Sequence, residues 1–410
     1  MSRARSSLLL TLCCAWSVAA TAQSFQEFLD RVNAESDSSR KSAIVNSFVA
    51  AQSKFPIVED STVYFLFRGV AASVKVVGDF SHWNPSESPS MAKLPGSDFF
   101  SLARQFESDA RLDYKILVDE KSWILDPLNP QTVTGGFGTN SEVALPDYVQ
   151  PVELLDHPEI SHGRVQSDSI FSRSLNMEKL YRVYLPPGYD SSNQRYPSLY
   201  VHDGYDYLSL GSMANVLDYL IVHRRIQPVI AVFVPPGDRD AEYVGEKKDQ
   251  HRTFVVEELR RHLDSRFRTI DSPSSRGIMG SSNGGHVSLY IAYNDPEVFG
   301  LVAGQSSTVL PPDSGWYRPY VQDFFDSFAT GPVKPLRVYL DVGTYDVPGF
   351  LESNRKFRTL LLSRGYRPRY QELHEGHSWG SWRAHLDDIL TLFFPPTLPP
   401  RSIQKKLTPE

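Results

Sequence analysis

Two adjacent serines, Ser281 and Ser282, stand between glycines in the stretch RGIMGSSNGGHVSLY. The residues before them read as a strand and those after them as a helix. A serine at a sharp strand-to-helix turn exposes its hydroxyl, and side chains two residues to either side would collide with neighbouring backbone. Centring the turn on Ser282 puts Gly280 and Gly284 at those places, whereas centring it on Ser281 puts methionine and asparagine there. The spacing therefore favours Ser282 as a nucleophile.

A serine hydroxyl attacks only when a neutral imidazole accepts its proton and an acid holds that imidazole in place. LRVYLDVGTYD places Asp346 just past an apolar strand, and QELHEGHSWGSWR places His377 just past the last one. Serine, acid and histidine in this chain order are typical of α/β-hydrolases. Asp341 on the strand and Glu352 on the following helix are alternative acids. Asp346 is favoured because it lies in a loop, where functional residues concentrate.

His374 competes with His377 for the role of base. It lies closer to the strand, whereas Gly376 lets the chain turn at His377, so His377 is favoured. His202 and His286 are interpreted as structural or cleft-lining residues. No cluster of histidine and carboxylate residues has the spacing of a metal site, so we expect neither a metal nor a cofactor.

The negative charge of a tetrahedral intermediate needs backbone N–H donors. One is expected from Asn283, the residue after the nucleophile. The second is expected from the loop after the strand PSLYVHDGYDY, at the N–H of Tyr205.

The elements that must position these residues fall into two regions of different texture. Short β-rich runs separated by turn residues over 55–147 predict a small immunoglobulin-like β-sandwich. From 162 to 396, apolar strands alternate with helical stretches, which predicts an α/β domain with a parallel sheet and its functional site beyond the strands' carboxyl ends. We expect a helical segment over 23–54, a linker over 148–161 and a flexible tail over 397–410.

The first 22 residues have the features of a cleaved signal peptide: Arg3 and Arg5, a short apolar run and an Ala-Thr-Ala site. We therefore expect a periplasmic or extracellular protein without a membrane anchor. Cleavage would remove both cysteines, Cys13 and Cys14, and leave the mature chain more acidic than the net charge of −6 of the full sequence. An acidic surface argues against nucleic acid or an anionic membrane as a partner. The sequence carries no signal for an oligomeric state.

Several stretches together resemble the bacterial putative-esterase family, which includes enterochelin, feruloyl and acetyl-xylan esterases. They are VYLPPGYD, YPSLYVHDG, GDRDAEY, the serine turn and GHSWGSWR, and the resemblance covers roughly residues 162–395. It implies an α/β-hydrolase with the triad Ser282, Asp346 and His377. The candidate substrate-binding residues are Trp379, Trp382, Arg383 and Arg239.

The β-rich region is similar to the glycogen-binding module of AMP-activated kinase β-subunits, through VGDFSHWNP, LDYKILVDEKSWILDP and GFGTNSEV. Carried over by position, the sugar-contacting candidates are Trp83, Lys115, Trp123 and Asn140. Exposed aromatic rings can stack on sugars while lysine and asparagine donate hydrogen bonds. The alternative is that Trp83 is a core residue and that the region binds no sugar.

These patterns favour a secreted serine esterase that works through an acyl-enzyme on a small-molecule or polysaccharide ester. Feruloyl or acetyl esters on carbohydrate and an enterochelin-type siderophore ester are the two substrate classes. One alternative is an acyltransferase of the mycolyltransferase type. The other is a carbohydrate-binding protein with an inactive hydrolase domain.

Overall fold

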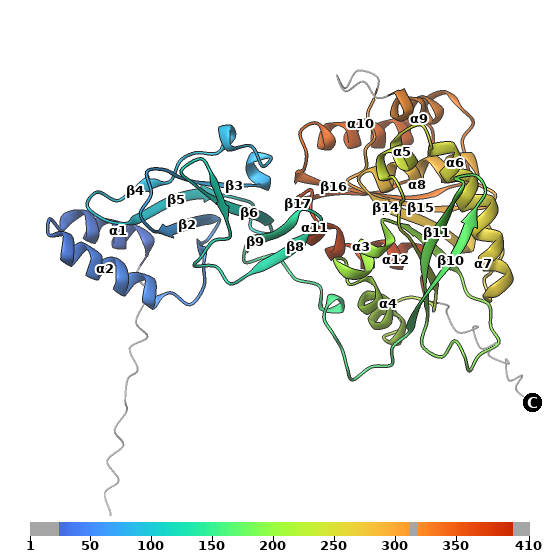
Figure 1. The fold of residues 1–410 in the computed structure, drawn as a ribbon, viewed down its shortest axis with the longest axis horizontal. Helices are drawn as coiled ribbons and strands as arrows, with labels where there is room; N and C mark the ends of the chain where they lie inside the picture. The colour runs from blue at the N-terminus through green and yellow to red at the C-terminus, as the bar shows by residue number, and fades with distance from the viewer. Residues whose placement is uncertain (1–23, 312–318, 397–410) are drawn as a thin grey trace, which may run out of the picture.

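A computed structural model describes residues 24–311 and 319–396. The chain forms two regions placed end to end, with the termini of the described chain in different regions (Figure 1). We call the part of the chain from β1 to β9, with its turns, the β-region, and the part from β10 to α12 the α/β region. The expected signal peptide and C-terminal tail lie outside the described residues.

Two helices, α1 (Phe25–Ala34) and α2 (Ser38–Ala51), pack on the outer end of the β-region (Figure 1). Ser24 begins α1 with a capping box, because its side chain accepts from the N–H of Glu27 and the Glu27 carboxylate accepts from the N–H of Ser24. Phe28 of α1 stacks on Phe48 of α2, and both belong to a core that includes Phe99 of the β-region. The apolar side of this helical pair is therefore buried.

The β-region consists of two antiparallel sheets that share one core. The first has the order β1 (Ile57–Glu59), β2 (Thr62–Arg68), β5 (Phe99–Gln105) and β4 (Ala92–Lys93). The second has β6 (Arg111–Val118) paired with β3 (Val74–Gly78), β7 (Ser122–Ile124) and β9 (Gly138–Ala144), and β9 paired with β8 (Thr132–Gly135). Alternate β6 residues, Leu112, Tyr114 and Ile116, face the core, so Arg111 and Asp113 point to the opposite face.

The α/β region is built on an eight-stranded sheet. In spatial order its strands are β10 (Arg164–Ser172), β11 (Met177–Leu185), β13 (Ile230–Val234), β12 (Ser198–His202), β14 (Arg276–Ser281), β15 (Leu301–Gln305), β16 (Arg337–Tyr345) and β17 (Arg369–Gly376). From β13 to β17 all neighbours are parallel. The predicted strand-then-helix order does not hold at the first edge, where β10 and β11 are antiparallel. The four residues between them are too few for a parallel crossover.

Helices cover both faces of this sheet (Figure 1). One face carries α5 (Arg239–Val244), α6 (Lys248–Thr253), a π-helical turn (Phe254–Leu259), α7 (Arg260–Arg266), α8 (Asn283–Asn294), α9 (Pro319–Thr330) and α10 (Phe350–Ser363). The other carries α3 (Gly204–Ser209), α4 (Met213–Val222), α11 (Trp379–Ala384) and α12 (Leu386–Phe393). Covering both faces explains why β12 to β15 are buried throughout.

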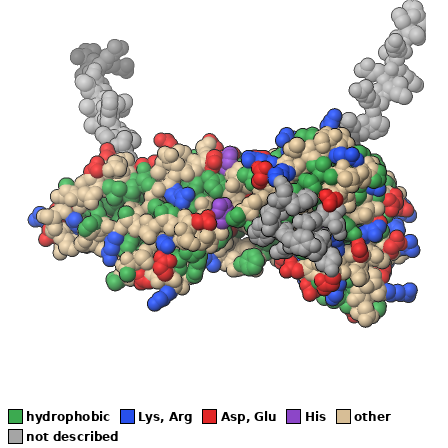
Figure 2. All heavy atoms as spheres, turned by 90° about the horizontal axis from the view of Figure 1, so that it is seen from above, with side chains coloured by type: hydrophobic (Ala, Val, Ile, Leu, Met, Phe, Trp, Pro, Cys, Tyr) green, Lys and Arg blue, Asp and Glu red, His purple; other side chains and the backbone are tan. Residues whose placement is uncertain are grey.

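The two regions meet where β17 runs alongside β6. Glu375 pairs in parallel with Arg111, so the large sheet continues into the second sheet of the β-region. Acidic and basic side chains are interspersed over both regions on the face drawn in Figure 2. Within the described ranges, no helix combines the length and the hydropathy that a membrane span requires.

Candidate active site

Ser282 is the first residue after β14 and the residue that caps α8. Its backbone has φ 55° and ψ −121°, a conformation that costs a non-glycine residue free energy and clusters at functional sites. A Cβ placed on Gly280 would lie 2.5 Å from the carbonyl carbon of Gly284, so the chain crosses itself too closely for side chains there. Ser282 is half-buried, whereas Ser281 is buried in β14.

His377 is the first residue after β17, and Asp346 is the first residue after β16. Since β14, β16 and β17 run parallel within one sheet, all three candidate residues lie at the same edge. His377 Nδ1 is 2.7 Å from Asp346 Oδ1. The Asp346 side chain is fully buried and also accepts from the N–H of Val347 at 2.7 Å. This leaves His377 Nε2 as the nitrogen that can serve a substrate.

Ser282 and His377 are linked through Gln305 and Trp382 rather than by a direct hydrogen bond. Among the described residues, no hydrogen bond links Ser282 to His377, and such contacts often tighten only when substrate binds. The N–H of Ser282 donates to the carbonyl of Gln305 at 2.8 Å, and Gln305 Nε2 donates to the carbonyl of Trp382 at 2.9 Å. The Trp382 ring meets the His377 ring edge-on, with centroids 4.9 Å apart. Phe350 meets the imidazole in the same manner, at 5.4 Å.

In the part of the chain that the structure describes, neither the alternative acids nor the alternative base bonds to His377 or Asp346. Asp341 accepts from Gln305 Nε2 at 3.1 Å, and burial raises the pKa of this carboxyl to about 6. Glu352 is exposed on α10. His374 Nδ1 lies 2.6 Å from Asp109 Oδ1 of the β-region. The geometry therefore pairs His377 with Asp346.

His202 and His286 are both buried, and each makes hydrogen bonds within the α/β region. His202 contacts Ser288 Oγ at 2.8 Å and His251 Nε2 at 3.0 Å. His286 Nδ1 lies 2.8 Å from the carbonyl of Thr308. Burial lowers the pKa of both imidazoles.

The two expected oxyanion donors lie in the first turns of two helices. Asn283 begins α8, and Tyr205 is the second residue of α3. N–H groups in a first turn have no acceptor within their own helix, so they can serve a ligand. A Cβ on Gly284 would lie 2.8 Å from Asp203 Oδ2, which shows that the turn before α3 rests against the serine turn.

Arg239, a candidate substrate-binding residue, holds this arrangement together. Its Nε and Nη2 donate to the two oxygens of Asp203, each at 2.8 Å, and Nη2 lies 3.4 Å from the carbonyl of Ser281. The guanidinium is therefore beside the site, with its fork occupied by Asp203.

The other substrate-binding candidates differ in exposure. Trp379 and Trp382 are each at most 7% exposed and belong to the core. Trp379 packs edge-on against Tyr207, with ring centroids 5.0 Å apart. Arg383 is half-buried. The structure thus places the two tryptophans in packing positions around the histidine rather than on a surface for stacking.

The sugar-contacting candidates do not form one exposed platform. Trp123 is 44% exposed and Lys115 is half-buried on neighbouring strands. Trp83 Nε1 instead donates to Asp79 Oδ1 at 2.9 Å, and Asn140 Nδ2 donates to Asp113 Oδ2 at 3.1 Å. Two of the four side chains are therefore engaged in hydrogen bonds within the β-region.

Sequence reasoning missed a group of polar residues of the β-region, in which Asp79 and Arg111 contact chain neighbours of His377 and Asp113 pairs with Arg111. A local signal existed, because Arg111, Asp113 and Lys115 stand at alternate positions of a strand whose other residues are apolar or tyrosine. That pattern shows that they share a face, but not that another region covers it. Across the described residues, no three histidine, cysteine or carboxylate side chains converge as a metal site requires.

Comparisons with known proteins show which proteins this chain resembles. The chain is 23% identical to the iron(III) enterobactin esterase of Escherichia coli O6:H1 over 359 residues, which cover 80% of this chain and 88% of the relative. The enterobactin esterase from Shigella flexneri, solved in the presence of enterobactin, superposes with a TM-score of 0.69 at 20% identity, over 84% of this chain and 97% of that one. A ferulic acid esterase from Anaeromyces mucronatus gives a TM-score of 0.51 at 20% identity, over 59% and 94%.

The structural likenesses confirm the predicted fold class, an α/β-hydrolase preceded by a smaller β-rich part. The sequence model of the family described as Putative esterase matches residues 172–393, more than half of the chain. The chain therefore belongs to the putative esterase family, and it is a carboxylic ester hydrolase.

Proposed function

We propose that the protein is a serine esterase that works through an acyl-enzyme. Ser282 is the nucleophile, His377 is the general base and acid, and Asp346 orients the imidazole. The observation that carries this proposal is the meeting at one sheet edge of a strained, half-buried serine and a histidine bound to a buried carboxylate at 2.7 Å. The alternative acids make no such contact.

In the first half-reaction, Ser282 Oγ attacks the ester carbonyl while His377 Nε2 takes the hydroxyl proton. The N–H groups of Asn283 and Tyr205 stabilise the oxyanion of the tetrahedral intermediate. Collapse breaks the bond to the alcohol oxygen, which receives the proton from His377. Water then repeats these steps against the acyl group and releases the carboxylic acid.

We propose a siderophore ester of the enterobactin type or a feruloyl or acetyl ester on carbohydrate as the substrate. The likeness to enterobactin esterases extends over both regions. The likeness to the ferulic acid esterase covers 59% of the chain, a share about as long as the α/β region. Turnover of iron-loaded enterobactin, methyl ferulate and acetylated xylan in parallel decides between them. Product analysis separates hydrolysis from acyl transfer to a sugar hydroxyl.

We also propose export to the periplasm or the medium through the sequence features of residues 1–22, followed by a β-rich domain over 55–147 and a catalytic domain over 162–396. N-terminal sequencing of the secreted protein tests the cleavage. A mature chain that begins at Met1 contradicts it.

The central experiment compares Ser282→Ala with Ser281→Ala, using p-nitrophenyl acetate. Loss of the nucleophile should lower kcat by at least about 10³-fold. The neighbouring serine, which is buried in β14, serves as the matched control and should keep most of the activity. Mass spectrometry of a rapidly quenched reaction should find the acyl adduct on the peptide that contains Ser282. An adduct elsewhere, or the reverse ranking of the two variants, overturns the proposal.

A further inference from the structure

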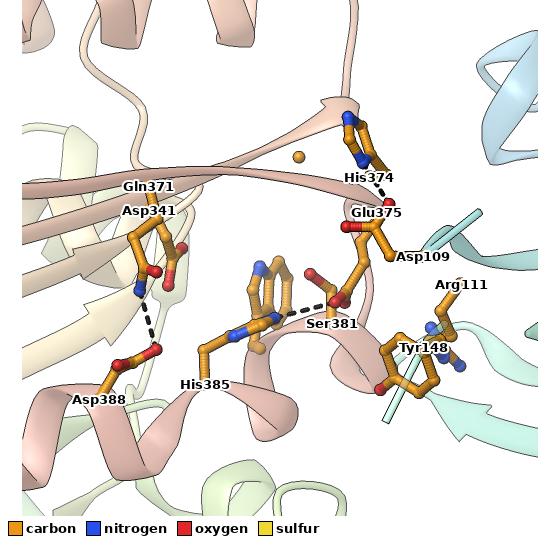
Figure 3. A network of polar contacts seen from close by, with 12 residues as sticks. Asp109, Arg111, Tyr148, Asp341, Gln371, His374, Glu375, Ser381, His385 and Asp388 are labelled. Carbon is orange, nitrogen blue, oxygen red and sulfur yellow. Dashed lines mark hydrogen bonds and ion pairs between the residues drawn. The ribbon is translucent and has the colours of Figure 1, made fainter. Parts of the chain in front are cut away.

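The segment that carries His377, residues 374–380, is contacted from the β-region along its length. We call it the histidine loop. His374 bonds to Asp109, and Glu375 pairs with Arg111 through the backbone. Figure 3 shows the carboxylate of Asp109, which lies in the turn before β6, beside His374. These contacts join residues that are more than 260 positions apart in the chain.

Arg111 is the centre of these contacts. Its side chain is fully buried, with Nη2 2.8 Å from Asp113 Oδ1 and Nε donating to Glu142 Oε2 at 3.0 Å. Its Nη1 donates to Ser378 Oγ at 3.2 Å. A Cβ placed on Gly380 would lie 2.1 Å from the guanidinium carbon, so the guanidinium packs directly on the backbone of α11. Arg111 therefore ties two carboxylates of the β-region to the residue that follows His377.

Asp79 supports the loop on the other side of the histidine. A Cβ placed on Gly376 would lie 2.0 Å from Asp79 Cγ. This buried carboxylate accepts from the N–H of Asp113 at 2.7 Å and from Trp83 Nε1 at 2.9 Å. Asn140 donates to Asp113 in turn. Two side chains at sugar-contacting positions of the resemblance thus belong to the support of the histidine loop.

We infer that the β-region acts as a positioning element for the catalytic histidine, with Arg111 and Asp79 as positioning residues that fix the backbone on either side of His377. The inference rests on the proposed serine mechanism. Asp346, Phe350 and Trp382 restrain the imidazole ring from within the α/β region. Arg111 and Asp79 instead contact the residues on either side of His377. A misplacement of about 1 Å at a catalytic group lowers turnover by roughly 10²-fold.

The test uses Arg111→Met and Arg111→Lys in the full chain, with kcat and KM measured on p-nitrophenyl acetate. Arg111→Met should lower kcat by about 10- to 100-fold while KM stays within about two-fold. Lysine keeps the charge but lacks the fork that spans Glu142 and Ser378, so Arg111→Lys should restore only part of kcat. Arg276→Met is the matched control, because Arg276 is also buried and ion-paired, to Asp264 and Asp271 at the opposite end of β14. It should lower Tm while kcat changes by less than about three-fold.

Trp83→Phe provides a second variant that removes one hydrogen bond to Asp79 and keeps a ring in place. It should lower kcat by about two- to five-fold on a substrate that contains no sugar. Wild-type turnover that Ser282→Ala abolishes establishes the underlying mechanism. If Arg111→Met then keeps wild-type kcat, or loses no more than Arg276→Met does, the positioning role alone is overturned. A kcat that Trp83→Phe leaves unchanged contradicts the role of Asp79.

Discussion

The serine turn and the histidine loop lie at the same sheet edge but are held by different means. The serine turn is fixed by its own sequence, since Gly280 and Gly284 let the chain cross itself and α8 begins at once. The histidine loop is fixed by contacts with residues as far as 267 positions away. The first arrangement depends mainly on local sterics, with Arg239 adding one contact to the carbonyl of Ser281, whereas the second depends on buried charges contributed by another region.

This difference teaches where each half of the site is vulnerable. Steric contacts do not depend on pH and are disturbed only when a side chain adds volume. Buried ion pairs lose their value when one partner is removed or changes its protonation state, because the remaining charge is then unsatisfied. Substitutions and pH should therefore affect the two halves of the site differently.

The largest effect should come from breaking the contact that fixes the imidazole. Asp346→Asn should lower kcat by about 10³- to 10⁴-fold, because an amide can hold the wrong tautomer of His377. Asp341→Asn is the matched control, since this carboxyl faces Gln305 rather than the histidine and burial raises its pKa to about 6. It should keep kcat within about ten-fold. Steady-state kinetics at pH 8 decide, and a reversed ranking would make Asp341 the acid.

The serine turn is tested by adding one methyl group. Gly280→Ala places a Cβ 2.5 Å from the backbone of Gly284, so the turn must open. We expect kcat to fall by about 10²-fold and the free energy of unfolding to fall by about 1–3 kcal/mol. Gly135→Ala is the control, because its Cβ would come no closer than 3.7 Å to its neighbours. Equal kinetics and equal urea midpoints for the two variants would contradict the steric argument.

The serine turn could be predicted from sequence because its signals are local. The glycine spacing selects Ser282, and the ends of apolar strands point to Asp346 and His377. Each of these three residues is the first one after its strand in the structure. A sequence pattern of an apolar strand followed by a polar loop is therefore enough to predict these positions.

The support of the histidine loop could not be predicted, because it depends on how β17 meets β6. Hydrophobic periodicity shows which face of β6 is polar but not what covers it. For the same reason, Trp83 and Asn140 matched sugar-contacting positions by residue type, although their hydrogen bonds run to Asp79 and Asp113. The antiparallel pairing of β10 with β11 was missed because periodicity carries no strand direction.

The ion pairs behind the histidine loop should make stability depend on pH. His385 Nε2 lies 2.8 Å from Glu375 Oε1 (Figure 3). Burial alone would disfavour the charged imidazole, but the Glu375 carboxylate outweighs it and raises the pKa of His385 from 6.5 to about 9. A raised pKa means that this stabilisation is complete below pH 6.5 and is lost as the pH rises through 9.

We therefore expect the free energy of unfolding to fall by about 3 kcal/mol over this interval because of His385. Urea unfolding at several pH values measures it, and His385→Gln should be less stable at pH 6 and show a flatter profile. Identical pH profiles for the wild type and His385→Gln would remove the ion pair from the account of stability.

The smallest effect should separate the two tryptophans at sugar-contacting positions. Trp123 is 44% exposed on β7, whereas Trp83 donates to the carboxylate that lies against Gly376. Trp123→Ala should therefore leave kcat and KM on p-nitrophenyl acetate within about two-fold, as surface changes away from specific contacts do. If Trp123→Ala instead lowers turnover of this small ester as much as Trp83→Phe does, the β-region acts on the site through its exposed face. The hydrogen bond to Asp79 would then no longer distinguish Trp83 from Trp123. We expect the two tryptophans to differ because of their connection to the histidine loop and not because of their residue type.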